Sequence, residues 1–361
     1  MADRLSACRG CFLGLAVGDA MGFAVDEKSW DEIREDYGPN GLLGYDLVNG
    51  GAEGSSYTQV AAYSANGLLL GITRGKPENY LSYLNLSLKE WARAQHFPRD
   101  PEKSFCWVAK LPQLRKKKYK DSRMLDALRA ATPGTTERPI NRAATPGSLP
   151  AAVMVGLAYN PKYMELAQVV RLGAQTVALT HGDPMAFLSG AVIAECVAGI
   201  LTDADKPLRE QFEDAIHAMQ NLYSMKYPQA DALAAALQKA MDRVGTEDPQ
   251  AGMEALYCNT ADECLAGAMY ACLSCPEDFD GAMILAVNHS GRSTAVGALT
   301  GAVLGAKMGA EALPDFYLES LELSPVLEQL ARDLALGSPT AGLFDDDWDH
   351  KYTQGLPVGR F

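Results

Sequence analysis

The 361-residue sequence has little of the patterning that marks membrane proteins or nucleic-acid-binding proteins. No uninterrupted apolar run reaches the ~20 residues that a membrane span needs. The apolar piece at 11–17 runs into Gly18 and Asp19 without a cleavage-like site, so no signal peptide is expected. Lys and Arg number 32 against 45 Asp and Glu, and the net charge is −13. We therefore expect a soluble, cytoplasmic protein that binds neither nucleic acid nor membrane.

The cysteines also lack the spacing of a small disulfide-rich scaffold. Eight are scattered along the chain, which fits a reducing compartment. Two pairs do read C-x-x-C, Cys8 with Cys11 and Cys272 with Cys275, and four such thiolates can bind zinc. Both pairs lie in alanine-rich helical surroundings without the turn of a zinc knuckle. We interpret them as core cysteines, with a zinc site as the alternative.

Strand patterns are scarce, whereas helical periodicity recurs along most of the chain. Stretches rich in glycine or proline at 45–56 and 130–150 indicate loops. No repeat, low-complexity segment or linker divides the sequence, so we predict one all-α domain over residues 1–361, with an acidic aromatic tail at about 340–361. The expected helices are about 3–17, 29–37, 57–75, 77–91, 151–158, 161–179, 184–202, 206–224, 228–242, 259–274, 277–288, 313–321 and 325–336.

Two segments from opposite ends of the chain carry glycine at every fourth position. These glycines are at 10, 14, 18 and 22 in the first segment and at 297, 301 and 305 in the second. Residues four apart lie on one face of a helix. A glycine inside a helix costs about 1 kcal/mol relative to alanine, and that cost is tolerated where another backbone must come close. We therefore predict that the two helices pack against each other.

The polar loop 288–294 precedes the second glycine helix. Free N–H groups and the helix dipole make such a position suitable for a ligand. If the two glycine helices pack together, Asp19 and Asp26 should lie near this loop.

The same residues carry a resemblance to a known family. The segments Arg9-Gly10, Gly18-Asp-Ala-Met-Gly22 and Val25-Asp26 resemble the opening of the ADP-ribosylglycohydrolase family, which includes dinitrogenase-reductase-activating glycohydrolase. Further segments agree in the family's order: Tyr57-Thr-Gln59, Thr180-His-Gly-Asp-Pro184 and the region from Asp278 to Asn288 with its small-residue helix. The resemblance covers nearly the whole chain. It implies a single compact, orthogonal all-α domain.

The carboxylates of the family's metal motifs are missing. Relatives typically bind two Mg²⁺ ions through a Thr-Asp-Asp-Thr motif and a Gly-Gly-Asp-Thr-Asp-Thr motif. In this chain Ser56 and Tyr57 replace the acids of the first motif, and Arg292 and Thr294 replace those of the second. Mg²⁺ requires hard oxygen ligands, and Arg292 is a permanent cation. We therefore expect no metal ion and no other cofactor.

Two interpretations of the site remain open. In the first, the pocket binds an ADP-ribose-like or other anionic ligand, free or on an ADP-ribosylated protein, and hydrolyses its glycosidic bond without Mg²⁺. Asp26 or Asp19 would be the general base. The expected ligand-binding residues are Tyr57, Thr58, His181, Asn288, His289, Ser290, Gly291, Arg292, Ser293 and Thr294. Alternatively, Arg292 pairs with Asp19 or Asp26 and closes the site, and His181 is structural.

In the second interpretation the protein is a catalytically inactive descendant. It would keep the fold and serve as a binding, immunity or structural protein, with a protein partner. Two segments bear on partners. The only basic run, 115–120, is interpreted as a solvated face or linker rather than an anion or partner patch. The tail 344–352 is expected to dock on the body, with partner contacts as the alternative.

Overall fold

The computed structural model describes residues 3–75, 77–96, 100–119, 121–338 and 346–353. Within these residues the regular elements are α-helices and short 3₁₀-helices, with two isolated β-bridges, so the predicted all-α class is confirmed. The α-helices are α1 (Arg4–Val25), α2 (Trp30–Tyr37), α3 (Ser56–Thr73), α4 (Tyr80–His96), α5 (Ser122–Arg129), α6 (Leu149–Leu157), α7 (Leu166–Ala178), α8 (Pro184–Thr202), α9 (Leu208–Tyr223), α10 (Gln229–Asp242), α11 (Pro249–Glu254), α12 (Ala261–Ser274), α13 (Phe279–Val287), α14 (Ser293–Met308), α15 (Asp315–Ser320), α16 (Ser324–Leu336) and α17 (Asp346–Tyr352).

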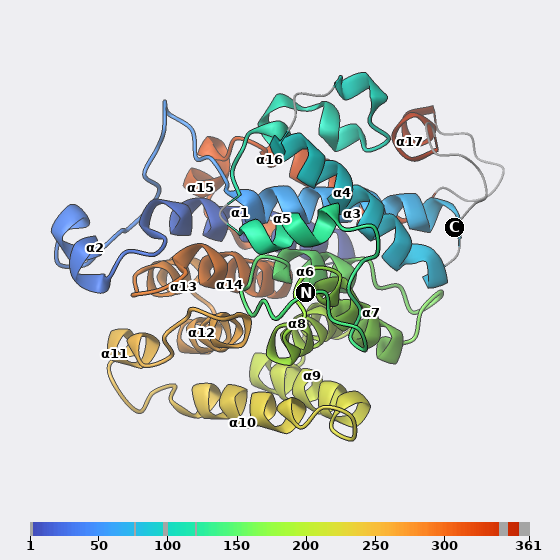
Figure 1. Ribbon diagram of the computed structural model, residues 1–361. Helices are drawn as coiled ribbons and strands as arrows, with labels where there is room; N and C mark the ends of the chain where they lie inside the picture. The colour runs from blue at the N-terminus through green and yellow to red at the C-terminus, as the bar shows by residue number, and fades with distance from the viewer. Residues whose placement is uncertain (1–2, 76, 97–99, 120, 339–345, 354–361) are drawn as a thin grey trace.

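Helices α1 and α14 lie side by side at the centre of the molecule (Figure 1). Their glycines face one another in antiparallel order, so that Gly14 meets Gly301 and Gly18 meets Gly297. A Cβ atom added at Gly14 would lie 2.1 Å from the carbonyl oxygen of Gly301, which no real structure accommodates. The predicted close packing of the two helices is confirmed, and we call this contact the glycine seam.

Helix α1 is longer than the sequence predicted. It continues through Gly18 and Asp19 to Val25, where the expected helix ended at about residue 17. A Gly-Asp pair resembles the end of a helix, but in the structure Gly18 is a seam contact and Asp19 is fully buried. Tertiary packing therefore overrides the local preference of these residues.

The other helices surround this pair, and their buried apolar side chains form one hydrophobic cluster. Helix α8 begins as predicted, with Asp183 accepting a hydrogen bond from the Met185 amide and Pro184 in the first turn. By length and mean hydropathy, α1 and α8 are apolar enough to cross a membrane, although the sequence shows no uninterrupted run. In the most apolar stretch of each, 83% and 78% of the residues are buried inside the protein, as in core helices.

Two short helices, α5 and α11, were not predicted, and α5 contributes to the site described below. The described part of the acidic tail, α17, docks on the body. Its Trp348 indole donates to Thr73 Oγ1 at 3.1 Å, and the fully buried Tyr352 hydroxyl donates to Asp333 at 2.6 Å. Tail residues 344 and 345 lie outside the described residues.

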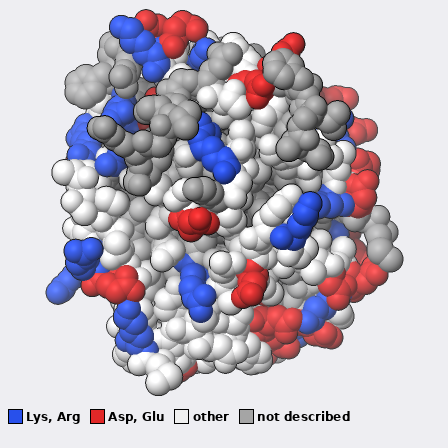
Figure 2. Space-filling model, turned by 90° about the vertical axis from the view of Figure 1, so that its right-hand side faces the viewer, with Lys and Arg blue, Asp and Glu red and all other residues white. Residues whose placement is uncertain are grey.

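Charges on the face shown in Figure 2 are mixed. Acidic side chains gather along one edge, and basic ones lie scattered between other residues, so no continuous basic field spans this face. The basic run before α5 is partly neutralised. Lys116 and Lys118 contact Glu53 at 2.9 and 2.6 Å, and Lys116 also contacts Glu322 at 3.1 Å. This part of the run is therefore engaged with acidic groups of the protein itself.

Candidate functional site

The N-terminus of α3 is held by a buried aspartate of α1. Asp19 accepts hydrogen bonds from the backbone N–H groups of Ser55 and Thr58, both at 2.8 Å, and from their two hydroxyls. Burial raises the pKa of Asp19, and these four hydrogen bonds oppose the rise. Because its carboxylate is occupied by α3, Asp19 acts as a helix cap. The structure gives it no place in the cavity that was expected to contain it.

The second aspartate, Asp26, ends α1 and meets the N-terminus of α14. Its Oδ1 accepts a hydrogen bond from the Thr294 amide at 3.1 Å. The expected proximity of Asp26 to the 288–294 loop is therefore confirmed. Unlike Asp19, Asp26 is half-buried and lines a cavity. The buried Thr294 lines the same cavity, and its hydroxyl has no hydrogen-bond partner among the described residues.

Arg292 forms an ion pair with a partly exposed carboxylate. Its guanidinium lies 3.0 Å from Glu27, whose side chain is about half exposed. Its Nε donates to the carbonyl of Asn259 at 3.1 Å, and its backbone N–H donates to that of Cys258 at 2.9 Å. The alternative in which Arg292 closes the site by pairing with Asp19 or Asp26 therefore stays a prediction, and Glu27 is a partner that the sequence did not indicate. The partner, Glu27, is the residue after Asp26. A positive φ of 64° at Glu27 turns it toward the surface.

Backbone strain surrounds Arg292. Tyr257 and Cys258 have φ of 61° and 49°, and Gly291 has φ of 148° with space for no side chain between it and their carbonyls. Positive φ is unfavourable for residues other than glycine and persists where the surrounding structure enforces it. The loops that position Arg292 are therefore held by tertiary contacts rather than by local preference.

Four residues of the 288–294 loop form its framework rather than the cavity wall. Asn288 is buried and exchanges two hydrogen bonds with the backbone of Leu42, at 2.7 and 2.8 Å. The Ser290 hydroxyl accepts from the Trp30 amide at 2.8 Å. The remaining two are Ser293, which is buried, and His289, whose pKa burial lowers. The structure places all four, with Gly291 and Thr58, outside the cavity lining.

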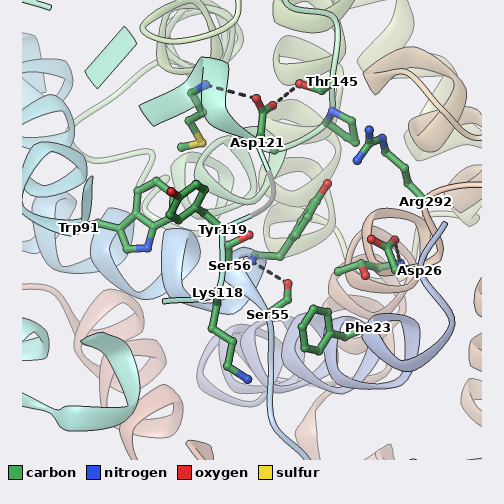
Figure 3. A pocket seen from close by; sticks show the side chains of 15 residues that line it. Phe23, Asp26, Ser55, Ser56, Trp91, Lys118, Tyr119, Asp121, Thr145 and Arg292 are labelled. Carbon is green, nitrogen blue, oxygen red and sulfur yellow. Dashed lines mark hydrogen bonds between the residues drawn. The ribbon is translucent and has the colours of Figure 1, made fainter. Parts of the chain in front are cut away.

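The cavity lies between the N-terminal ends of α3, α5 and α14 (Figure 3). Asp26 and Arg292 stand on one side of it, Asp121 and Thr145 on another, and aromatic rings complete the wall. The space is narrow, because the room in which the centre of a water molecule can lie is about 30 Å³. Its lining comprises Phe23, Asp26, Ser55, Ser56, Tyr57, Trp91, Lys118, Tyr119, Asp121, Met124, Thr145, Pro146, Gly147, Arg292 and Thr294.

Tyr57 is a half-buried residue of this wall. Burial, followed by the nearby Cys264 and Asp26, raises the pKa of its hydroxyl well above the usual value, and the positive charge of Arg292 opposes the rise. The hydroxyl therefore stays protonated over the whole physiological range. It can donate a hydrogen bond to an anionic group beside Arg292.

His181 lies behind the cavity wall and does not line the cavity. Its ring is fully buried, with Nδ1 2.8 Å from the hydroxyls of both Ser148 and Thr180. Nε2 lies 3.0 Å from Thr145 Oγ1 and 3.2 Å from Asp121 Oδ2. Both ring nitrogens are therefore occupied, so His181 positions Asp121 and Thr145 rather than contacting a ligand.

Asp121 is the residue of the wall that sequence reasoning missed. Burial would raise its pKa, but hydrogen bonds from His181 and Thr145, together with the Met124 amide, outweigh burial and hold the pKa well below its usual range. Asp121 also caps α5 by accepting from the Arg123 amide at 2.9 Å. The signal was an Asp-Ser pair at a helix start, immediately after the basic run. Lys118, Tyr119, Phe23 and Trp91 were likewise not predicted as cavity residues.

The described residues do not fit a divalent metal centre. No group of three or more His, Cys, Asp or Glu side chains in the described part of the chain is arranged to hold a metal ion. The Asp19 carboxylate is taken up by four hydrogen bonds, and a guanidinium lines the cavity. Hard cations need several oxygen ligands at once, and these side chains do not offer such a set. The paired C-x-x-C cysteines likewise form no such group.

The fold and the site together define the class of protein. It is an all-helical protein with a polar cavity at the N-termini of three helices. The chain belongs to the ADP-ribosylglycohydrolase family, which it matches over residues 1–343. It is 25% identical to an uncharacterized protein of Archaeoglobus fulgidus over 331 residues, which is 90% of this chain and 95% of that protein. In fold it is similar to a solved ADP-ribosylglycohydrolase-related protein complex, with a TM-score of 0.55 and 24% identity over 92% of this chain and 98% of that chain.

Proposed function

We propose that the cavity binds an ADP-ribosyl group or a related anionic ligand without a divalent metal ion. The observation that carries this proposal is the position of Arg292. Its guanidinium lines the cavity, while its ion-pair partner Glu27 lies at the surface instead of inside it. A guanidinium presents several N–H donors in a planar fork, which suits phosphate oxygens.

The other polar groups of the wall would complete this anion site. The unpartnered Thr294 hydroxyl and the protonated Tyr57 hydroxyl supply two further donors. Ser56 adds a hydroxyl and the N-terminus of α3, although Asp19 occupies part of that terminus. The ligand would be a free ADP-ribose-like molecule or an ADP-ribosylated protein. No nucleic acid or membrane is proposed as a partner, and the proposed location is the cytoplasm.

The proposed reaction is hydrolysis of an N- or O-glycosidic bond of the ADP-ribosyl group. Asp26 would act as the general base that activates water for attack at the anomeric carbon. Asp121, which the pKa depression keeps ionised, stands elsewhere on the wall as a second carboxylate. Asp19 has no part in this scheme because α3 takes up its carboxylate.

One observation favours a second candidate, an inactive family member that acts through a protein partner. The room of about 30 Å³ is enough for water but not for a whole ADP-ribose molecule, so a ligand must displace side chains of the wall.

Calorimetric titration with ADP-ribose, with Mg²⁺ or with EDTA, separates the two candidates. For the first candidate, we expect the same Kd in both conditions and a loss of at least about tenfold in affinity in Arg292→Ala, since a hydrogen bond to a charged group is worth about 1.5–3 kcal/mol. Glu27→Gln is the matched control because it removes the partner of Arg292 and keeps the guanidinium. Absence of binding by the wild-type protein in every condition would overturn the ligand site, and co-purification would then seek the partner.

Turnover is tested separately on ADP-ribosylated arginine and serine peptides. We expect release of ADP-ribose that EDTA does not change and that Asp26→Asn abolishes. Loss of activity in EDTA with recovery on adding Mg²⁺ would overturn the metal-independent scheme. Binding without turnover on these substrates would leave a ligand-binding protein that lacks the proposed hydrolase activity.

A further inference from the structure

A second cavity lies between the C-terminal ends of α4 and α5, apart from the candidate site. The room in which the centre of a water molecule can lie is about 290 Å³, against about 30 Å³ in the candidate site. Four of its lining side chains are basic, namely Lys89, Arg93, His96 and Arg129, and the rest are alanine and leucine. We call it the basic cavity. Such a concentration of basic groups is unexpected in a protein of net charge −13.

The positive charges of this cavity are only partly neutralised. Glu90 lies near enough to Arg93 for the guanidinium to lower the pKa of its carboxyl, so the charge of Arg93 is partly offset. Arg129 contacts Asp126 at 3.4 Å, but both side chains are largely exposed, and exposed pairs contribute little. Lys89 donates to the carbonyl of Ala130 at 3.1 Å, which points its ammonium group toward the end of α5.

The pKa of His96 shows the effect of the positive charges around the cavity. Burial is the main cause that lowers its pKa, and the positive charges of Arg129 and Lys117 add to the effect, while Asp126 opposes it. Its ring also packs against Tyr119, with 5.4 Å between the ring centres. The positive charges of these basic groups therefore disfavour the protonated form of His96. The same charges would attract an anion bound in the cavity.

Helix dipoles explain part of this arrangement. Arg93 and His96 lie in the last turn of α4, and Arg129 lies in the last turn of α5, where cations are favourable. The dipoles do not account for an open space that the apolar side chains of Ala92 and Leu128 line together with these cations. Pockets with an apolar lining and a few polar groups are the usual form of a small-molecule site.

We propose that the basic cavity binds an organic phosphate, a small molecule in which a phosphate or pyrophosphate is joined to an apolar or aromatic body. The phosphate would lie among Arg93, Arg129 and Lys89, and the body would contact the alanine and leucine side chains of the lining. Inorganic phosphate would use the cations alone. A nucleoside without phosphate would use the apolar side chains alone.

The test follows the His96 ring by NMR while AMP, adenosine or inorganic phosphate is added at fixed ionic strength. The protein has five histidines, so a His96→Gln variant assigns the signal. We expect AMP to shift the signal and raise the pKa of His96. AMP should bind at least tenfold more tightly than either adenosine or inorganic phosphate. The double variant Arg93→Ala with Arg129→Ala should lose at least tenfold in AMP affinity.

Two controls keep this result separate from the candidate site. Arg123→Ala removes the same charge from another face of α5 and should leave AMP binding unchanged. Arg292→Ala alters only the candidate site, so the His96 response to AMP should persist there even if ADP-ribose binding is lost. Equal binding of AMP and adenosine, equal binding of AMP and inorganic phosphate, or full AMP affinity in the double variant would each overturn the proposal.

Discussion

The glycine seam and the cavity lie along the same two helices but tolerate change very differently. Along the seam, a single added carbon at Gly14, Gly18 or Gly301 would fall about 2 Å from a backbone oxygen of the other helix. At the cavity, the ring of Tyr57 and the guanidinium of Arg292 line an open space instead of a backbone. We therefore expect substitutions in the seam to disturb the fold and substitutions in the cavity wall to be tolerated better.

The same difference between scaffold and site separates two aspartates, Asp19 inside α1 and Asp26 directly after its end. Asp19 is fully buried and accepts four hydrogen bonds from one neighbouring helix start. Asp26 is half-buried and accepts the Thr294 amide at the cavity. The first belongs to the scaffold and the second to the site, although the sequence offered both as the general base.

The largest expected effect is on the seam. In Gly301→Ala the new Cβ would lie 1.9 Å from the Gly14 carbonyl oxygen, so the two helices must move apart. We expect a loss of more than about 4 kcal/mol in the free energy of unfolding, or no folded protein. Urea denaturation measures it. Gly44→Ala, where no atom lies within 4 Å, is the control and should change stability by less than about 1 kcal/mol. A mild effect at Gly301 would contradict the seam.

The next effect compares the two aspartates. In Asp19→Asn an amide group faces the donors of Ser55 and Thr58, and buried groups left without partners cost about 1–3 kcal/mol. Asp26→Asn keeps a carbonyl oxygen that can accept from the Thr294 amide, so it should cost about 1 kcal/mol or less. Thermal unfolding of both variants gives the comparison. Equal losses of stability would remove the distinction between scaffold and site.

A titrating group inside the scaffold gives a smaller effect that depends on pH. Burial raises the pKa of Glu195 in α8 from 4.5 to about 7. A carboxyl group with a raised pKa in the folded state contributes stability that is present below pH 4.5 and is lost as pH rises through about 7. Glu195→Gln should therefore flatten the fall in stability over this window, measured by urea denaturation at several pH values. The exposed Glu210→Gln on α9 should keep the wild-type profile, and an unchanged profile in Glu195→Gln would contradict the assignment.

The smallest expected effect is that of the surface ion pair. Glu27→Gln breaks the ion pair with Arg292. The Glu27 side chain is half exposed, and such exposed pairs are worth about 0.2–1 kcal/mol. We expect a change in unfolding free energy near the lower limit of denaturant measurements. A loss above about 2 kcal/mol would mean that the pair holds the strained loop around Gly291 in place.

The sequence predicted most of the scaffold because its signals are local and periodic. The glycine spacing identified the seam, and the Asp183-Pro184 cap located the start of α8. Helix α1 was predicted too short because Gly18 and Asp19 resemble a helix end, and only the partner helix explains their place inside it.

The site was predicted less completely because its geometry depends on contacts between distant segments. Asp26, Tyr57, Arg292 and Thr294 do meet at one cavity. The pairing of Arg292 with Glu27 requires a positive φ that no residue pattern indicates. Helix α5 and its Asp121 were missed because eight residues give too short a periodic signal.

The glycine seam also has a consequence for the order in which the protein can be made. Helix α1 ends at Val25, and the helix that covers its glycine face begins at Ser293. At about 5–20 residues per second, the ribosome needs roughly 15–55 s to synthesise the intervening chain. During that interval an apolar helix has no permanent partner. We therefore expect the nascent chain to depend on chaperones that bind its first segment, and to fold only late in synthesis.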